Sequence, residues 1–160
     1  MSEETDSVGC VLISAPGKGD GEGSKLAAHL LEEAGHKVIR QTTIKDSGLM
    51  IKGELAILAE SSSCQAIVVV GGTALAARET VLDAIQKLLD KSIPGFGEIF
   101  RHLTFTRHGA IAITERALAG IYKGRLLLVI PASTEAVRLA MDEMILPELG
   151  NMVRQTSRGR

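Results

Sequence analysis

Two consecutive glycines follow a strongly apolar stretch near the middle of the chain. Residues 66–70 are all apolar, and Gly71, Gly72 and Thr73 come before the next helical pattern. A turn of this kind exposes backbone N–H groups, and a following helix adds partial positive charge at its N-terminus. The sequence therefore predicts that these three residues hold a phosphate or a carboxylate. A tight turn without a ligand is the alternative, because the spacing matches neither a nucleotide-hydrolase phosphate loop nor a dinucleotide fingerprint.

A second strand-to-helix junction lies at Pro131–Thr134. Ser133 or Thr134 can cap the helix that follows, and Ser133 is also a candidate ligand contact. The carboxylates nearest the two junctions are Asp46, Glu79 and Glu115. Each of these is a candidate for acid chemistry or metal binding, and each is equally well explained as a solvated surface charge.

The elements that would position these residues follow from the hydrophobic pattern. Short apolar or alternating runs predict four strands, at 8–13, 36–43, 66–70 and 125–131. Helical periodicity predicts four main helices, at 24–35, 46–61, 78–91 and 134–149, with Pro147 bending or ending the last. Two short helices are expected at 98–103 and 115–121.

Strands that alternate with helices indicate an α/β protein with a mostly parallel sheet covered on both faces. In such sheets, ligands bind beyond the carboxyl ends of the strands. Three loops should lie there, at 14–24, 71–79 and 131–134. We expect a flexible leader at 1–7, one domain at 8–150, and a basic tail at 151–160.

The composition argues against several classes of partner. The chain of 160 residues carries a net charge of −1 and contains one Tyr and three Phe. The chain has neither the net positive charge nor the number of aromatic residues that would favour nucleic acid as a partner. The N-terminal residues resemble no secretory signal, and no apolar run nears the roughly 20 residues of a membrane span, so we expect a cytoplasmic protein without a membrane partner.

Several segments together resemble one family, the MoaB/MogA-type molybdenum cofactor biosynthesis proteins. The matching segments are spread in order over nearly the whole chain: EAGHKV (33–38), VVVGGTAL (68–75), LLDKSIPGFGEIFRHLTF (88–105), ERALAGIYKGRLLLVIPAS (115–133) and ILPELG (145–150). The most specific piece is IPGFGEIFR, since nothing general about α/β proteins requires it.

The resemblance implies a three-layer α/β/α sandwich that assembles as a homo-trimer or homo-hexamer. It also implies binding of the terminal phosphate of molybdopterin, a phosphorylated pterin, and its adenylylation with ATP and Mg²⁺. The roles it assigns are phosphate or pterin binding for Gly71, Gly72, Thr73 and Ser133, and Mg²⁺ binding and catalysis for Asp46 and Glu79.

Four residues depart from the family pattern at or near this site. Ala74 and Ala132 stand where the family has glycine, Glu115 where it commonly has serine, and Glu79 where it has the catalytic aspartate. The extra methylene of Glu79 moves its carboxylate by about an ångström, and errors of that size can cost about 10²-fold in rate. A non-catalytic, oligomeric pterin- or nucleotide-binding relative with a degenerate site is therefore the alternative hypothesis.

Overall fold

The chain folds around one six-stranded sheet with strand order β2-β1-β3-β6-β5-β4. The computed structural model describes residues 7–17 and 19–157. The strands are β1 (Gly9–Ala15), β2 (Lys37–Thr43), β3 (Ala66–Gly71), β4 (Lys91–Ser92), β5 (Leu118–Tyr122) and β6 (Arg125–Ile130). The first four in the spatial order are parallel, whereas β5 and β4 pair antiparallel at one edge.

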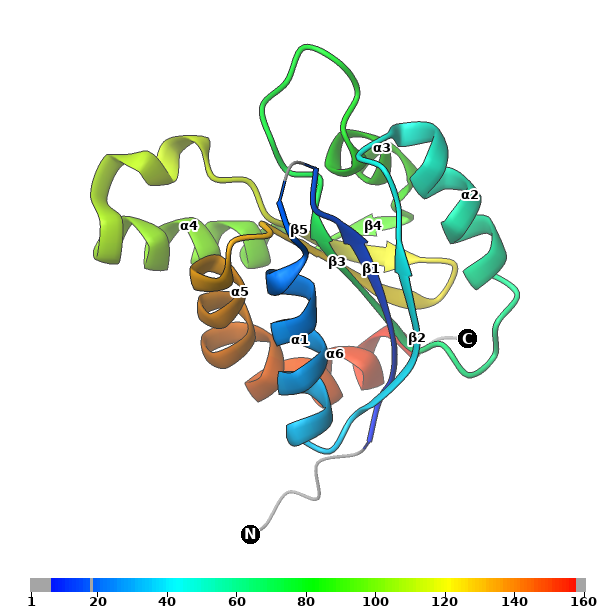
Figure 1. The fold of residues 1–160 in the computed structure, drawn as a ribbon. Helices are drawn as coiled ribbons and strands as arrows, with labels where there is room; N and C mark the ends of the chain where they lie inside the picture. The colour runs from blue at the N-terminus through cyan, green and yellow to red at the C-terminus, as the bar shows by residue number, and fades with distance from the viewer. Residues whose placement is uncertain (1–6, 18, 158–160) are drawn as a thin grey trace, which may run out of the picture.

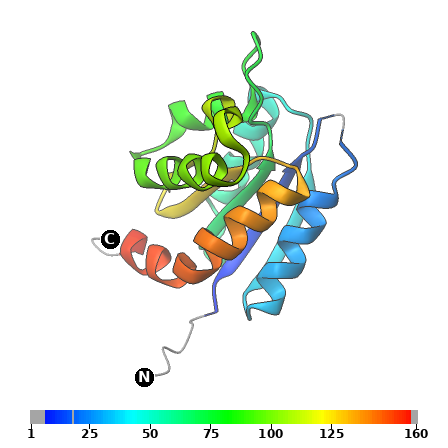
Figure 2. The ribbon, with the colours of Figure 1, turned by 90° about the vertical axis from the view of Figure 1, so that its left-hand side faces the viewer.

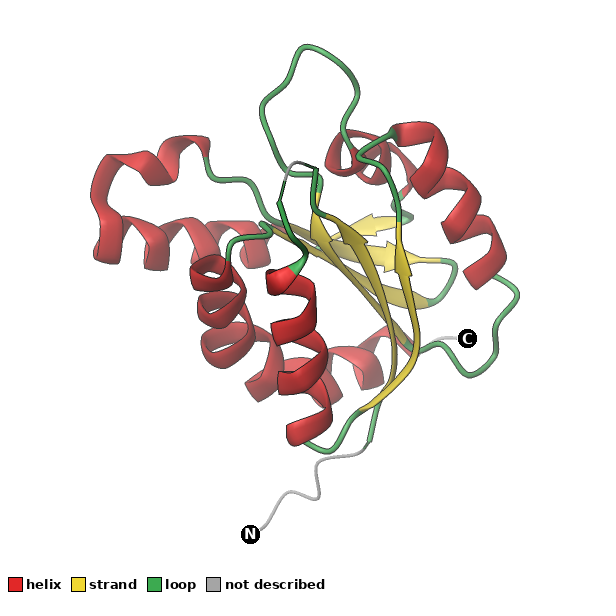
Figure 3. Cartoon of the chain, viewed as in Figure 1, coloured by secondary structure: helices red, strands yellow, loops and turns green. Residues whose placement is uncertain are grey.

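Helices cover both faces of this sheet (Figures 1 and 3). On one face lie α1 (Glu22–Glu33), α4 (Pro94–His108), α5 (Thr134–Ala140), the π-helical turn η2 (Met141–Ile145) and α6 (Leu146–Ser157). On the other face lie α2 (Gly48–Leu58) and α3 (Val81–Leu88). The short 3₁₀ helix η1 (Gly109–Thr114) continues from α4. The expected three-layer α/β/α sandwich with a mostly parallel sheet is confirmed.

The central strands carry apolar side chains toward both helical layers. In β3, Val68 and Val70 pack in the α1/α5 layer, whereas Ile67 and Val69 pack in the α2/α3 layer. Successive side chains of a strand point to opposite faces, so a strand buried on both sides must be apolar at every position. The continuous apolar runs of the sequence therefore predicted the interior strands correctly.

The helix expected at 115–121 is wrong, because residues 118–122 form strand β5. A two-residue turn at Lys123 and Gly124, with φ of 49° and 76°, connects β5 to β6. Turns with positive φ at both central residues match the twist of a hairpin. The pairing of β5 with β6 therefore decides the conformation of a short apolar segment whose periodicity was ambiguous.

Two other helices begin at residues that differ from the expected ones, because of the residues at their N-termini. Helix α3 begins at Val81 instead of residue 78, since Thr80 caps it, and residues 91–92 form β4 instead of ending that helix. Helix α4 is longer than expected, with Pro94 in its first turn, where the missing N–H is harmless.

Pro147 does not end the last helix, contrary to one of the two expectations. Residues 134–157 remain helical through α5, η2 and α6, and Pro147 is the second residue of α6. The π-helical turn directly before α6 changes the hydrogen-bond pattern there, and such turns occur within α-helices as single-turn insertions. The segment 151–157 of the expected tail is thus helical, with Val153 buried. Residues 1–6 of the expected leader and 158–160 of the tail lie outside the described residues.

Candidate functional site

Three loops lie at the carboxyl ends of the parallel strands, as the sequence predicted: one after β1, described at 16–17 and 19–21, one at 72–80 after β3 and one at 131–133 after β6. We call residues 71–80 the glycine loop. Figures 1 and 2 show it projecting beyond the end of the sheet. Gly71 and Gly72 both have positive φ, 105° and 72°. A side chain at either position would collide with the backbone at Ala15 or with the Val81 side chain, so both glycines are needed for this turn.

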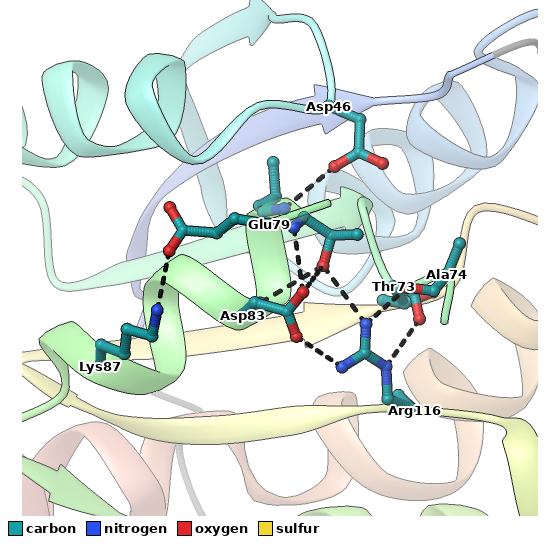
Figure 4. Close-up of polar contacts among 9 residues, drawn as sticks. Asp46, Thr73, Ala74, Glu79, Asp83, Lys87 and Arg116 are labelled. Carbon is teal, nitrogen blue, oxygen red and sulfur yellow. Dashed lines mark hydrogen bonds and ion pairs between the residues drawn. The ribbon is translucent and has the colours of Figure 1, made fainter. Parts of the chain in front are cut away.

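The backbone N–H groups of residues 73–79 have no hydrogen-bond acceptor within the part of the chain that the structure describes. The carbonyls of Thr73 and Ala74, in contrast, accept hydrogen bonds from the Arg116 guanidinium, the first at 3.0 Å. Arg116 also contacts the Oδ1 atom of Asp83 at 2.7 Å (Figure 4). One arginine just before β5 therefore joins the glycine loop to α3.

The first turn of α3 is closed by a reciprocal cap. The Thr80 hydroxyl accepts from the Asp83 N–H, and the Asp83 carboxylate accepts from the Thr80 N–H at 3.0 Å. This hydrogen bond, followed by the one from Arg116, lowers the pKa of Asp83 to about 2. Asp83 is thus ionised near neutral pH, and it orients Arg116 toward the glycine loop.

The remaining N-terminal amides of α3 are also engaged. The Val81 N–H donates to the Oδ1 atom of Asp46 at 2.9 Å, and the Leu82 N–H donates to the carbonyl of Gly72 at 3.0 Å. A helix offers only its first few N–H groups to an anion. The first N–H groups of α3 are therefore already occupied within the chain, in contrast to those of residues 73–79.

Both predicted catalytic carboxylates are ion-paired within the chain. The Oδ2 atom of Asp46 lies 2.8 Å from the Arg78 guanidinium. Glu79 contacts Lys87 at 2.9 Å and Lys52 at 3.4 Å, through different carboxylate oxygens. The hydrogen bond from Lys87 is the largest cause that lowers the pKa of Glu79.

These contacts do not fit a Mg²⁺ site. All four oxygens of Asp46 and Glu79 already face a cationic side chain or a backbone N–H. Asp46 and Glu79 are therefore arranged as partners of cationic side chains in this structure, and not as a free pair of Mg²⁺ ligands.

Ser133 lies in a different cavity from Glu79. It borders a hollow of about 310 Å³ that is also lined by Glu115, His108 and Glu135, whereas Glu79 borders a separate hollow of about 540 Å³ with Asp83 and Lys87. The Ser133 hydroxyl accepts from the Ala136 N–H and caps α5. The structure therefore groups Asp46, Glu79 and the glycine loop, and places Ser133 and Glu115 together elsewhere. Ala132 follows β6 at the entrance to α5.

Sequence reasoning missed four residues that the structure brings to the glycine loop: Asp83, Arg116, Lys52 and Lys87. The spacing of Thr80 and Asp83 is that of a capping box, so Asp83 was detectable. Arg116 stands inside a matched family segment. The two lysines could not be predicted from the sequence pattern. Lys52 reaches Glu79 because α2 packs beside α3, and Lys87 reaches it because the end of the loop turns back over α3.

The fold and the glycine loop define an α/β protein with a glycine turn at the carboxyl edge of its mostly parallel sheet. Residues 7–151 match the model of a family described as the probable molybdopterin binding domain, and the chain belongs to this family. It is 42% identical over 136 residues to molybdenum cofactor biosynthesis protein B of Halalkalibacterium halodurans, covering 84% of this chain and 80% of that protein. It is 36% identical over 157 residues to the protein of the same name from Bacillus subtilis, covering 96% and 92%.

Solved structures support the same family. A crystal structure of molybdenum cofactor biosynthesis protein B superimposes with a TM-score of 0.89 and 31% identity, covering 98% of this chain and 99% of that chain. The tungsten cofactor synthesizing protein MoaB from Pyrococcus furiosus shares the fold, with a TM-score of 0.86 and 22% identity, covering 96% and 99%. No helix among the described residues is long and apolar enough to cross a membrane.

Proposed function

We propose that this chain binds the terminal phosphate of molybdopterin at the glycine loop, as a protein of molybdenum cofactor biosynthesis. The observation that carries the proposal is the loop conformation: the N–H groups of residues 73–79 have no acceptor among the described residues. Arg116 contacts two carbonyls of the loop, and Lys52 and Lys87 pair with Glu79 near its end. Backbone amides and nearby cations are the groups that proteins use to hold phosphates. The family description and the names of the relatives support molybdopterin as the phosphorylated compound.

Adenylyl transfer with ATP and Mg²⁺ is the activity that the family resemblance implies. The contacts of Asp46 and Glu79 favour the alternative, a non-catalytic binding role, because both carboxylates are engaged by cations of the same chain. Incubation of the purified protein with molybdopterin, ATP and Mg²⁺ separates the two. Formation of adenylylated molybdopterin would establish the enzyme, whereas binding without transfer supports the non-catalytic role.

Molybdopterin binding is tested by calorimetry with a charge placed in the glycine loop. Ala76→Glu adds a negative charge to an exposed position of the loop, and we expect it to weaken binding by about tenfold or more. Ser62→Glu adds the same charge to an exposed loop that follows α2 and should leave affinity unchanged. Equal affinities of the wild type and Ala76→Glu would contradict binding at this loop.

We also propose that the chain assembles with copies of itself, as a homo-trimer or homo-hexamer. The α4–η1 arm (residues 94–114) carries the exposed apolar side chains Ile99, Phe105, Ile111 and Ile113. Several large apolar side chains exposed on one element commonly mark an interaction surface. The cytoplasmic location stays a prediction from the sequence.

A further inference from the structure

The carboxylate of Asp46 links two elements of the chain. It accepts from the Val81 N–H at the start of α3, and it pairs with Arg78, which also donates to the Asp46 carbonyl at 2.6 Å. Only 11% of the Asp46 side chain is exposed, compared with 56% of Arg78. Asp46 therefore holds the glycine loop and α3 against the β2–α2 connection, and its carboxylate is directed into the protein.

Glu79 makes a comparable link on the outer side of the loop. One carboxylate oxygen contacts Lys52 of α2 and the other contacts Lys87 of α3. A Cβ atom at Gly48, the first residue of α2, would collide with this carboxylate. The glutamate side chain thus lies between the two helices and holds both lysines beside the glycine loop.

The balance of charge around the loop determines which ions it can accept. Four cationic side chains, Lys52, Arg78, Lys87 and Arg116, are paired with only three carboxylates, Asp46, Glu79 and Asp83. A divalent cation that bound Asp46 and Glu79 would have to displace these cations or lie against them, and like charges at such distances repel strongly. A phosphate that approaches from solvent meets the exposed lysines and the free loop amides instead.

We propose that Asp46 and Glu79 act as internal counter-ions that hold Arg78, Lys52 and Lys87 around the glycine loop, so that the loop binds phosphate without a divalent cation. The two carboxylates are positioning residues for these cations and not metal ligands. The part of this inference that concerns the ligand rests on the proposed function. The part that concerns the metal does not depend on the proposed function.

The metal part is tested with Mn²⁺, whose paramagnetic resonance spectrum changes when the ion binds protein. We expect the wild type to leave the free Mn²⁺ signal unchanged at millimolar metal. The Lys52→Gln/Lys87→Gln double variant, which frees both oxygens of Glu79, should bind Mn²⁺ at least about tenfold more tightly than the wild type. Wild-type binding that Asp46→Asn or Glu79→Gln weakens would overturn the inference, and so would a double variant that gains no affinity.

The ligand part is tested with inorganic phosphate, followed by the amide chemical shifts of residues 73–79. The affinity should be the same within about twofold in Mg²⁺ and in a chelator, and Lys87→Gln should lower it by about fivefold. Lys37→Gln, an exposed change at the start of β2, is the matched control and should have no effect. A tenfold gain on adding Mg²⁺, no effect of Lys87→Gln, or no phosphate binding at all would each overturn this part. If molybdopterin fails to bind while phosphate binds as described, the proposed function fails and the inference stands.

Discussion

At the scale of single residues, Asp83 is the best-defined charged group of the site. Its carboxylate caps α3 through Thr80 and pairs with Arg116, and 29% of its side chain is exposed. Its folded-state pKa is depressed to about 2 from an ordinary value of 3.8. Its contribution to stability is therefore complete above about pH 4 and is lost as the pH falls through the folded-state pKa.

We expect Asp83→Asn to lower the free energy of unfolding by about 1–2 kcal/mol at neutral pH, because the amide keeps part of the cap but loses the charge. The difference from the wild type should shrink as the pH is lowered from about 4 toward about 2. Urea denaturation at several pH values measures this. Asp142→Asn, which removes an exposed partner of Arg138, is the control and should cost less at every pH. A difference that stays constant down to the lowest pH would disprove the linkage.

At the scale of elements, Arg116 decides how the glycine loop is attached. It lies just before β5, and its guanidinium contacts two loop carbonyls, the Thr80 hydroxyl and Asp83. Arginine suits this position because its planar group donates several hydrogen bonds in fixed directions, which lysine cannot do. The antiparallel edge of the sheet therefore supports a loop that belongs to the parallel part.

Arg116→Lys should loosen the glycine loop without unfolding the protein. We expect faster hydrogen exchange at the hydrogen-bonded amides that close the loop, those of Thr80, Val81 and Leu82, and a loss of about 1–3 kcal/mol in the free energy of unfolding. Arg138→Lys, at an exposed ion pair of α5, should leave exchange in the loop unchanged. Unchanged loop exchange in Arg116→Lys would show that the loop holds its conformation independently.

At the scale of the whole molecule, the α4–η1 arm extends to one side of the sheet (Figure 1). Ile113 is 81% exposed and follows the apolar residues Ala110, Ile111 and Ala112. A large apolar side chain left in water forgoes about 1.5–3 kcal/mol of burial. Contact with another copy of the chain would recover part of that free energy.

Ile113→Asp should therefore reduce the mass of the assembly in solution, measured by light scattering after gel filtration. The charged side chain would have to be buried in the contact, which is costly. Ile57→Asp changes an exposed apolar residue of α2 and serves as the comparison. Equal losses of mass in both variants, or none in Ile113→Asp, would contradict a contact through the arm.

Much of the fold could be predicted from the local hydrophobic pattern of the sequence. The apolar runs at 66–70 and 125–130 had to be interior strands, because a strand covered on both faces is apolar throughout. The segment 118–122 could not be assigned in this way, since short apolar runs suit a helix or a strand equally and the pairing with β6 decides between them. The continuation of the helix past Pro147 likewise could not be predicted, because it involves a π-helical turn that no single residue type indicates.

The sequence alone determined the α/β architecture, the family and the position of the glycine loop. These follow from periodicity and from segments that are contiguous in the chain. Only the tertiary structure decided which groups the two carboxylates contact. Asp46 pairs with Arg78, and Glu79 pairs with Lys52, across about 30 residues of sequence. Electrostatic pairing depends on distances in space, so the same Asp46 and Glu79 that suggest metal chemistry in the sequence are counter-ions of neighbouring cations in the folded chain.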